Sequence, residues 1–246
     1  MRLDQYLLKM SLVKSRSQAT DYIKRGLVLN HDEIILKPSY QVKPTDLIKL
    51  KEQMHFVSRA GEKLYHALID FDISFNDKVV IDIGSSTGGF TDCALSHGAR
   101  KVYSYDVGTE QMDIRLKNNP KVFLHEQTNI LDVDIPSADV CLIDVSFTSI
   151  LPIIEHLKGF DKEILALIKP QFEAGHNKFK GVLKDKKMHE QILRSILTSI
   201  SEMGFHLRGL KKSYIKGKKG NQEYVLYIKQ KNQHFDINKA IGEVLC

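Results

Sequence analysis

Residues 78–92, KVVIDIGSSTGGFTD, decide the fold, because a short apolar run there passes directly into a glycine-rich turn. The run is rich in valine and isoleucine, as is typical of a strand buried on both faces of a parallel sheet. Residues 88–98, GGFTDCALSHG, then predict a helix that ends at Gly98. A buried strand that leads through glycines into a helix is the first unit of an alternating α/β fold.

Strands and helices continue to alternate outward from this stretch. We expect strands within 101–108, 121–129, 138–146 and 163–170, then an amphipathic helix over 188–204 that buries Ile192, Ile196, Leu197 and Ile200. Residues 204–215 and 222–230 are expected to close the sheet as an antiparallel pair. The pattern predicts a doubly wound, Rossmann-like α/β sheet. Ligands bind beyond the carboxyl ends of the strands in such sheets, where we expect Asp82, Asp106, Asp144 and Lys169.

The first fifty residues predict a separate, small α+β domain. Two short helices are expected, one from Leu3 to Met10 and one from Ser15 or Ser17 to Arg25, followed by strands within 27–30, 33–36 and 46–50. Residues 51–58 then form an exposed linker, and residues 59–246 the α/β domain. The small domain holds 9 Lys or Arg against 5 Asp or Glu, a balance of +4. Composition alone favours a solvated basic helix face there over a binding surface.

The totals limit the classes of function. The chain has 246 residues and a formal net charge of +6, which favours a polyanionic partner such as nucleic acid. Its three cysteines, Cys93, Cys141 and Cys246, have no metal-ligand spacing, so we expect no metal site and a reducing cytoplasm. No apolar stretch approaches the length of a membrane helix, and the N-terminus lacks a signal-peptide pattern.

The glycine-rich turn predicts a ligand site. Its pattern is D-x-G-x-x-x-G-G rather than the G-x-G-x-x-G of dinucleotide loops. Asp82 is expected at the end of the first strand, and Asp106 at the end of the next, where it can bind ribose hydroxyls. Two carboxylates without a local cation suit S-adenosylmethionine, which carries a sulfonium and an amino group, better than they suit NAD. The loop by itself also allows NAD or a plain strand-to-helix turn.

Four charged residues form a candidate catalytic set: Lys63, Asp144, Lys169 and Glu223. Lys169 is the most informative, because it ends the apolar run 164–168 and directly precedes Pro170. Each also has a plain interpretation, as a surface helix residue, an exposed glutamate or a simple ion pair. Together they suit methyl transfer to a weakly acidic hydroxyl, in which a base must take the hydroxyl proton. A lysine can be that base when burial and a second cation, here Lys63, favour its neutral form, and the carboxylates would orient both lysines.

These motifs resemble three known families. The run RLDQYLL…SRSQA…IKRGLVLN within residues 2–30 resembles the S4 domain, a small RNA-binding fold. The charged set resembles the Lys-Asp-Lys-Glu tetrad of FtsJ-like ribose 2′-O-methyltransferases. The stretches VSRAGEKL, DIGSSTGGFTD, YDVGTEQM, DVSFTSI, IKPQFEAG, KGVLKD and KGKKGNQEY are jointly similar to the TlyA family, also labelled hemolysin, over about residues 1–230. The resemblance implies a class I methyltransferase sheet and S-adenosylmethionine-dependent methylation of ribose 2′-hydroxyls in ribosomal RNA, with cytidines as targets.

The resemblance also implies roles for individual residues. The catalytic set is Lys63, Asp144, Lys169 and Glu223. The residues expected around the cofactor are Asp82, Gly84, Ser85, Thr87, Gly88, Gly89, Phe90, Thr91, Asp106, Val107, Gly108, Asn129 and Asp144. The residues expected on RNA are Arg2, Lys14, Arg16, Lys24, Arg25, Arg59, Lys211, Lys212, Lys216, Lys218 and Lys219. By charge alone, the lysine-rich loop at 211–219 is equally well read as a solvated loop.

Three residues depart from the family pattern: Gln127 and Leu131 stand where arginines are frequent, and Tyr214 where proline is common. These departures bear on RNA contacts and on the choice of target. The expected partners are ribosomal RNA and ribosomal subunits, without a membrane or a protein partner. Three alternatives stay open: a non-catalytic RNA-binding protein on a methyltransferase fold, a membrane-active hemolysin, and an NAD-linked oxidoreductase.

Overall fold

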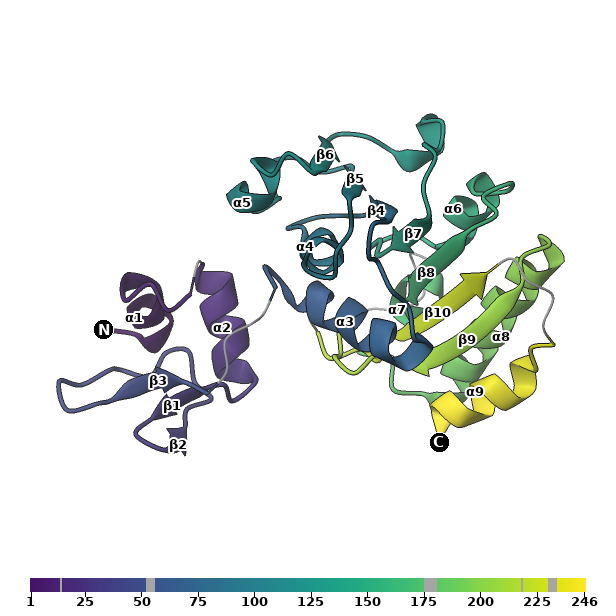
Figure 1. Cartoon of the computed structure of the whole chain (residues 1–246). Helices are drawn as coiled ribbons and strands as arrows, with labels where there is room; N and C mark the ends of the chain where they lie inside the picture. The colour runs from purple at the N-terminus through teal and green to yellow at the C-terminus, as the bar shows by residue number, and fades with distance from the viewer. Residues whose placement is uncertain (14, 52–55, 175–180, 218, 230–233) are drawn as a thin grey trace. The chain divides into compact units, whose positions relative to one another are not determined.

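The computed structural model (Figure 1) describes every residue of the chain except 14, 52–55, 175–180, 218 and 230–233. Lys14, Lys218 and half of the predicted linker therefore lie outside the described residues. The chain divides into two compact units, residues 1–54 and 55–246, and each unit is described by itself.

The first unit packs two helices beside a small antiparallel sheet. Its elements are α1 (Leu3–Lys9), α2 (Arg16–Lys24), β1 (Val28–Asn30), β2 (Glu33–Ile34) and β3 (Ile48–Leu50), with strand order β2-β1-β3. Ser15 begins α2, because its hydroxyl accepts a hydrogen bond from the backbone N–H of Gln18. Gly26 follows α2 with φ +72°, a conformation that favours glycine. Leu3, Leu7 and Ile23 are fully buried between the helices and the sheet.

The second unit is a seven-stranded sheet covered by helices, as predicted. Its strands are β4 (Val79–Ile83), β5 (Lys101–Tyr105), β6 (Val122–His125), β7 (Val140–Ile143), β8 (Glu163–Ile168), β9 (Leu207–Lys212) and β10 (Tyr224–Lys229). The helices are α3 (Arg59–Phe71), α4 (Gly89–Ser96), α5 (Ile114–Lys117), the 3-10 turn η1 (Ile130–Asp132), α6 (Leu151–His156), α7 (Pro170–Glu173), α8 (Lys186–Glu202) and α9 (Ile237–Leu245). The strand order is β6-β5-β4-β7-β8-β10-β9. β10 runs antiparallel to both of its neighbours, β8 and β9, and the other neighbouring strands are parallel. The predicted α/β class and the closing antiparallel pair are confirmed.

Helices cover both faces of this sheet (Figure 1). α3 and α4 pack on one face through Leu64, Leu68 and Cys93, and α6, α8 and α9 pack on the other. The predicted face of α8 was partly wrong. Leu193 is fully buried there whereas Ile192 is only half-buried, because the buried stripe follows positions 193, 196, 197 and 200.

The predicted linker 51–58 ends earlier than expected. Phe56 is buried in the core of the second unit, against the face that holds α3 and α4. The backbone N–H of Val57 donates to Asp92 Oδ2 at 2.8 Å, which ties this segment to α4. Two apolar residues, Phe56 and Val57, are too short a run to show a periodicity, so the sequence did not reveal that residues 56–58 belong to the packed unit.

The strand ends place the candidate residues. β7 ends at Ile143 and β8 at Ile168, so Asp144 and Lys169 emerge at the carboxyl edge of the sheet. Tyr224 pairs with Ile168 in the antiparallel register, so Glu223 emerges at the same edge. Within the described part of the chain, no helix is long and apolar enough to cross a membrane. The same residues contain no group of three or more His, Cys, Asp or Glu that could hold a metal ion.

Candidate active site

Two buried ion pairs lie at the carboxyl edge of the sheet. Lys169 Nζ is 2.6 Å from Asp144 Oδ1 and donates to Ser146 Oγ at 3.0 Å. Lys63, on α3, places its Nζ 2.5 Å from Glu223 Oε2. The four side chains are between 4% and 12% exposed, so these ions are largely removed from water. Buried charges of this kind persist only when they are paired.

The two pairs are neighbours in the sheet. β8 and β10 are adjacent, and the pairing of Ile168 with Tyr224 brings Lys169 and Glu223 to the same end of these two strands. Gln171, in the single turn of α7, donates from Nε2 to Glu223 Oε1 at 3.4 Å. All four residues that the sequence singled out therefore come from separate elements to one edge.

Sequence reasoning missed two polar partners of this set, Ser146 and Gln171. Each lies two positions beyond a predicted residue, Asp144 and Lys169 respectively, and this short spacing was the signal available. The loop that carries Ser146 is also held by Glu173, whose Oε1 accepts the backbone N–H of Ile150 at 3.0 Å. Burial raises the pKa of the Glu173 carboxyl group above its ordinary value.

The glycine-rich turn after β4 forms a tight cradle. Gly84 has φ +83°, and a Cβ there would lie 2.8 Å from the backbone oxygen of Asp144. Gly88 has φ +88°, and a Cβ there would lie 2.3 Å from Leu116 Cδ1. Only glycine meets both the conformational and the spatial demand. The turn therefore approaches the β7 end that carries Asp144.

Asp106 organises two loops beside this turn. Its Oδ2 accepts the backbone N–H of Ser86, and its Oδ1 accepts that of Gly108, both at 2.7 Å. Val107 is 73% exposed, and Thr87 and Asn129 are also exposed. The Asn129 side chain accepts the backbone N–H of Leu131 at 3.2 Å. These residues form an open rim around the glycine-rich turn.

Four residues expected at the cofactor lie instead beneath the loop. Asp82 is inside β4 with no exposed surface, and the Thr91 hydroxyl, equally buried, donates to its Oδ2 at 2.6 Å. Burial raises the pKa of Asp82 to about 7, although the hydrogen bond from Thr91 opposes this shift. Phe90 is in the apolar core, and a Cβ on Gly89 would collide with Ser58 and Ala60. These four residues support the loop from below, because β4 continues to Ile83 and so keeps Asp82 inside the sheet.

Some of the residues expected on RNA lie beside carboxylates, and others are exposed to solvent. Arg2 and Arg16 both donate to the buried Asp4, with 42% and 60% of their side chains exposed. Lys24 is exposed, Arg25 lies 3.7 Å from Asp21, and Arg59 is half-buried at the start of α3. Lys211, Lys212, Lys216 and Lys219 are exposed at the end of β9 and in the following loop, which leads to Glu223.

Comparison with known proteins agrees with this architecture. The profile of FtsJ-like methyltransferases matches residues 56–230, and that of the S4 domain matches residues 1–48. Hemolysin A of Brachyspira hyodysenteriae is 41% identical over 240 residues, which cover 92% of this chain and 99% of the relative. The 16S/23S rRNA (cytidine-2′-O)-methyltransferase TlyA of Mycobacterium tuberculosis is 33% identical over 240 residues, 93% of this chain and 89% of the relative.

A solved structure covers the whole chain. It is a protein of Streptococcus thermophilus with a provisional hemolysin name, 35% identical, with a TM-score of 0.78 over 100% of this chain and 94% of that one. The chain belongs to the S-adenosylmethionine-dependent, FtsJ-like methyltransferases that carry an N-terminal S4 domain, the family of TlyA and hemolysin A.

Proposed function

We propose that this protein methylates a ribose 2′-hydroxyl in ribosomal RNA, with Lys63, Asp144, Lys169 and Glu223 as its catalytic residues. The observation that carries the proposal is the pair of buried lysine–carboxylate contacts at one edge of the sheet, beside the glycine-rich turn. Ligands of doubly wound sheets bind at this edge.

The residues around the turn fit S-adenosylmethionine. Gly84 and Gly88 let the turn pack tightly against Asp144 and Leu116, which holds its backbone at the edge of the sheet where ligands of this fold bind. The buried hydroxyl of Ser85, in the turn itself, has no hydrogen-bond partner among the described residues. Asp106 keeps acceptor capacity for ribose hydroxyls beyond its two backbone contacts. When bound, the cofactor supplies an activated methyl group.

The chain's own residues then handle the proton. Lys169 acts as the base in its neutral amine form, after its ammonium has given a proton to solvent. The amine takes the proton from the 2′-oxygen, and the Asp144 carboxylate stabilises the ammonium that re-forms, at the distance of the observed ion pair. Ser146 fixes the direction of Nζ. The Lys63 ammonium, held by Glu223, stabilises the negative charge that develops on the 2′-oxygen.

Ribosomal RNA is the substrate that the relatives and the charge favour. The TlyA relative is named for cytidines of both 16S and 23S rRNA, and the S4 profile matches the basic first unit. Exposed Arg16 and Lys24, with the lysines at 211–219, offer cations for phosphates. We propose cytidine within a ribosomal subunit as the target, which makes the cytoplasm the place of action.

Methyl incorporation tests the proposal. The protein, with methyl-labelled S-adenosylmethionine, should label ribosomal RNA that lacks the modification, offered as free RNA, as either subunit or as whole ribosomes. Calorimetry should show binding of S-adenosylmethionine and none of NAD. A protein that binds RNA but labels none of these substrates would support the non-catalytic alternative and contradict the proposal.

A further inference from the structure

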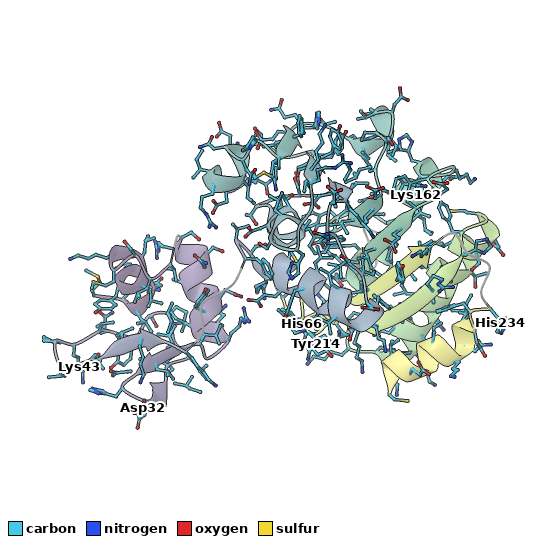
Figure 2. All side chains as sticks on the ribbon, in the orientation of Figure 1. Asp32, Lys43, His66, Lys162, Tyr214 and His234 are labelled. Atoms are coloured by element: carbon cyan, nitrogen blue, oxygen red, sulfur yellow. The ribbon has the colours of Figure 1, made fainter. Side chains whose placement is uncertain are left out.

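An aromatic pair with one exposed ring lies close in the chain to the candidate active site. Tyr214, in the loop after β9, stacks on His66 of α3, with ring centroids 4.3 Å apart and planes inclined by 19° (Figure 2). Tyr214 is 67% exposed, which is unusual for so large a side chain. His66 follows Lys63 by one helical turn. One ring face of the tyrosine is covered by His66, and most of its remaining surface is open to solvent.

The backbone beside Tyr214 is fixed to the catalytic edge. The N–H of Ser213 donates to the backbone oxygen of Glu223 at 2.9 Å, and Gln222 Nε2 donates to the oxygen of Ser213 at 3.0 Å. Farther along the loop, the N–H of Gly217 donates to the oxygen of Asn221 at 2.8 Å. The tyrosine is therefore presented by an anchored loop that includes the neighbours of Glu223.

The positive charge of this segment favours a polyanionic ligand. Lys211 and Lys212 precede Tyr214, Lys216 and Lys219 follow it, and all four are exposed. A flat aromatic ring among exposed lysines offers a stacking face for a base and cations for the phosphates on either side. A surface that binds a protein partner usually has few charged residues at its centre, unlike this segment.

We propose that the Tyr214–His66 pair is a stacking platform for an unpaired nucleobase next to the nucleotide that is methylated. The platform continues the ring stack outward, so the base lies on the exposed face of Tyr214. This inference rests on the proposed RNA substrate and adds the residues that fix the RNA beside the catalytic edge.

Tryptophan fluorescence tests the platform directly, because the chain contains no tryptophan. The Tyr214→Trp variant carries a single tryptophan, whose emission should fall as unmodified ribosomal RNA is titrated. Filter retention measures RNA binding independently and gives the concentrations at which binding saturates. Phe123→Trp is the matched control, since Phe123 is exposed on β6. β6 and β9 are the two outermost strands of the sheet and lie farthest apart in the strand order. The emission of Phe123→Trp should stay constant. Unchanged emission from Tyr214→Trp at RNA concentrations that saturate binding would overturn the platform.

Truncation separates stacking from loop support. Tyr214→Ala should weaken RNA binding by about 5- to 100-fold, the range expected for one stacked base, while S-adenosylmethionine binding stays unchanged. Tyr214→Phe should restore binding because it keeps the ring. Restored binding by Tyr214→Leu, or equal loss of RNA and cofactor binding in Tyr214→Ala, would assign the ring a structural role only. Failure of the wild-type protein to methylate RNA would refute the proposed function, whereas these readouts report RNA binding alone.

Discussion

The two edges of the seven-stranded sheet both bury lysine and glutamate, but they do so differently. At the amino edge, Glu163 accepts hydrogen bonds from Lys78, Lys229 and the Tyr227 hydroxyl, at 2.5, 2.9 and 2.7 Å. Burial opposes ionisation of Glu163, but these three donors outweigh it and lower its pKa to about 2. At the carboxyl edge, each of two carboxylates meets one lysine, beside an exposed serine and a glycine cradle.

The difference separates a structural cluster from the cluster that we propose to be catalytic. Three donors around a single carboxylate tie β4, β8 and β10 together and leave that carboxylate no free role. At the carboxyl edge, the Lys169–Asp144 and Lys63–Glu223 pairs each join one lysine to one carboxylate, which leaves hydrogen-bond donors and acceptors for a substrate. Burial and an ion pair are therefore shared by both clusters, and the proposal of a catalytic lysine rests on the surrounding loops and on the edge at which Lys169 lies.

The largest expected effect comes from the carboxyl edge. Lys169→Ala should lower the single-turnover rate of methyl transfer by about 10²- to 10⁴-fold, because it removes the proposed base. Calorimetry should show cofactor affinity close to that of the wild type. Turnover at the wild-type rate would mean that Lys169 is not the base, and that the two edges do not differ in the way proposed.

Glu223→Gln should have a smaller effect, of about 10- to 100-fold on the rate. The amide keeps the shape but leaves the buried Lys63 ammonium without its counter-charge. The single-turnover rate at saturating RNA is the readout, and RNA affinity is the control. An unchanged rate would mean that this pair supports only the fold.

Asp82 is a buried carboxyl group inside β4, between the two edges, and its effect on stability should depend on pH. Its folded pKa of about 7 lies above the ordinary 3.8, so the stability that the neutral carboxyl group contributes is fully present below pH 3.8, is lost as pH rises toward 7, and changes little beyond. The free energy of unfolding of Asp82→Asn, relative to the wild type, should rise by up to about 4 kcal/mol between pH 4 and pH 8. Urea denaturation across this range measures the difference, and a flat difference would contradict the assigned burial.

Glu163→Gln should leave methyl transfer unchanged and reduce stability by about 1–3 kcal/mol at pH 7, because Lys78 and Lys229 lose their counter-charge. The folded pKa of Glu163 lies below the ordinary 4.5, so its stabilisation is present above pH 4.5 and is lost as pH falls toward 2. Denaturation curves of variant and wild type should therefore converge in acid. A loss of activity larger than the loss of folded protein would show that the amino edge takes part in catalysis.

The sequence predicted this fold well because its strands are apolar runs with clear ends. Lys169 could be recognised because it interrupts such a run just before Pro170. Asp82 was misplaced, since the strand extends one residue beyond it. The Tyr214–His66 stack and the contact of Gln171 with Glu223 join loops and helices distant in sequence, where no periodicity marks a contact. The departure at Tyr214 was visible in the sequence, but its partner was not.

The proposed chemistry at the carboxyl edge requires that the transferred methyl group lie on a ribose and not on a base. Ribosomal RNA labelled by the protein can be hydrolysed in alkali, which cleaves RNA through free 2′-hydroxyls. A methyl group on a ribose 2′-oxygen blocks that cleavage, so the account predicts label in an alkali-resistant dinucleotide that Lys169→Ala fails to produce. Label released in single nucleotides would place the methyl group on a base and would contradict the proposed role of the carboxyl edge.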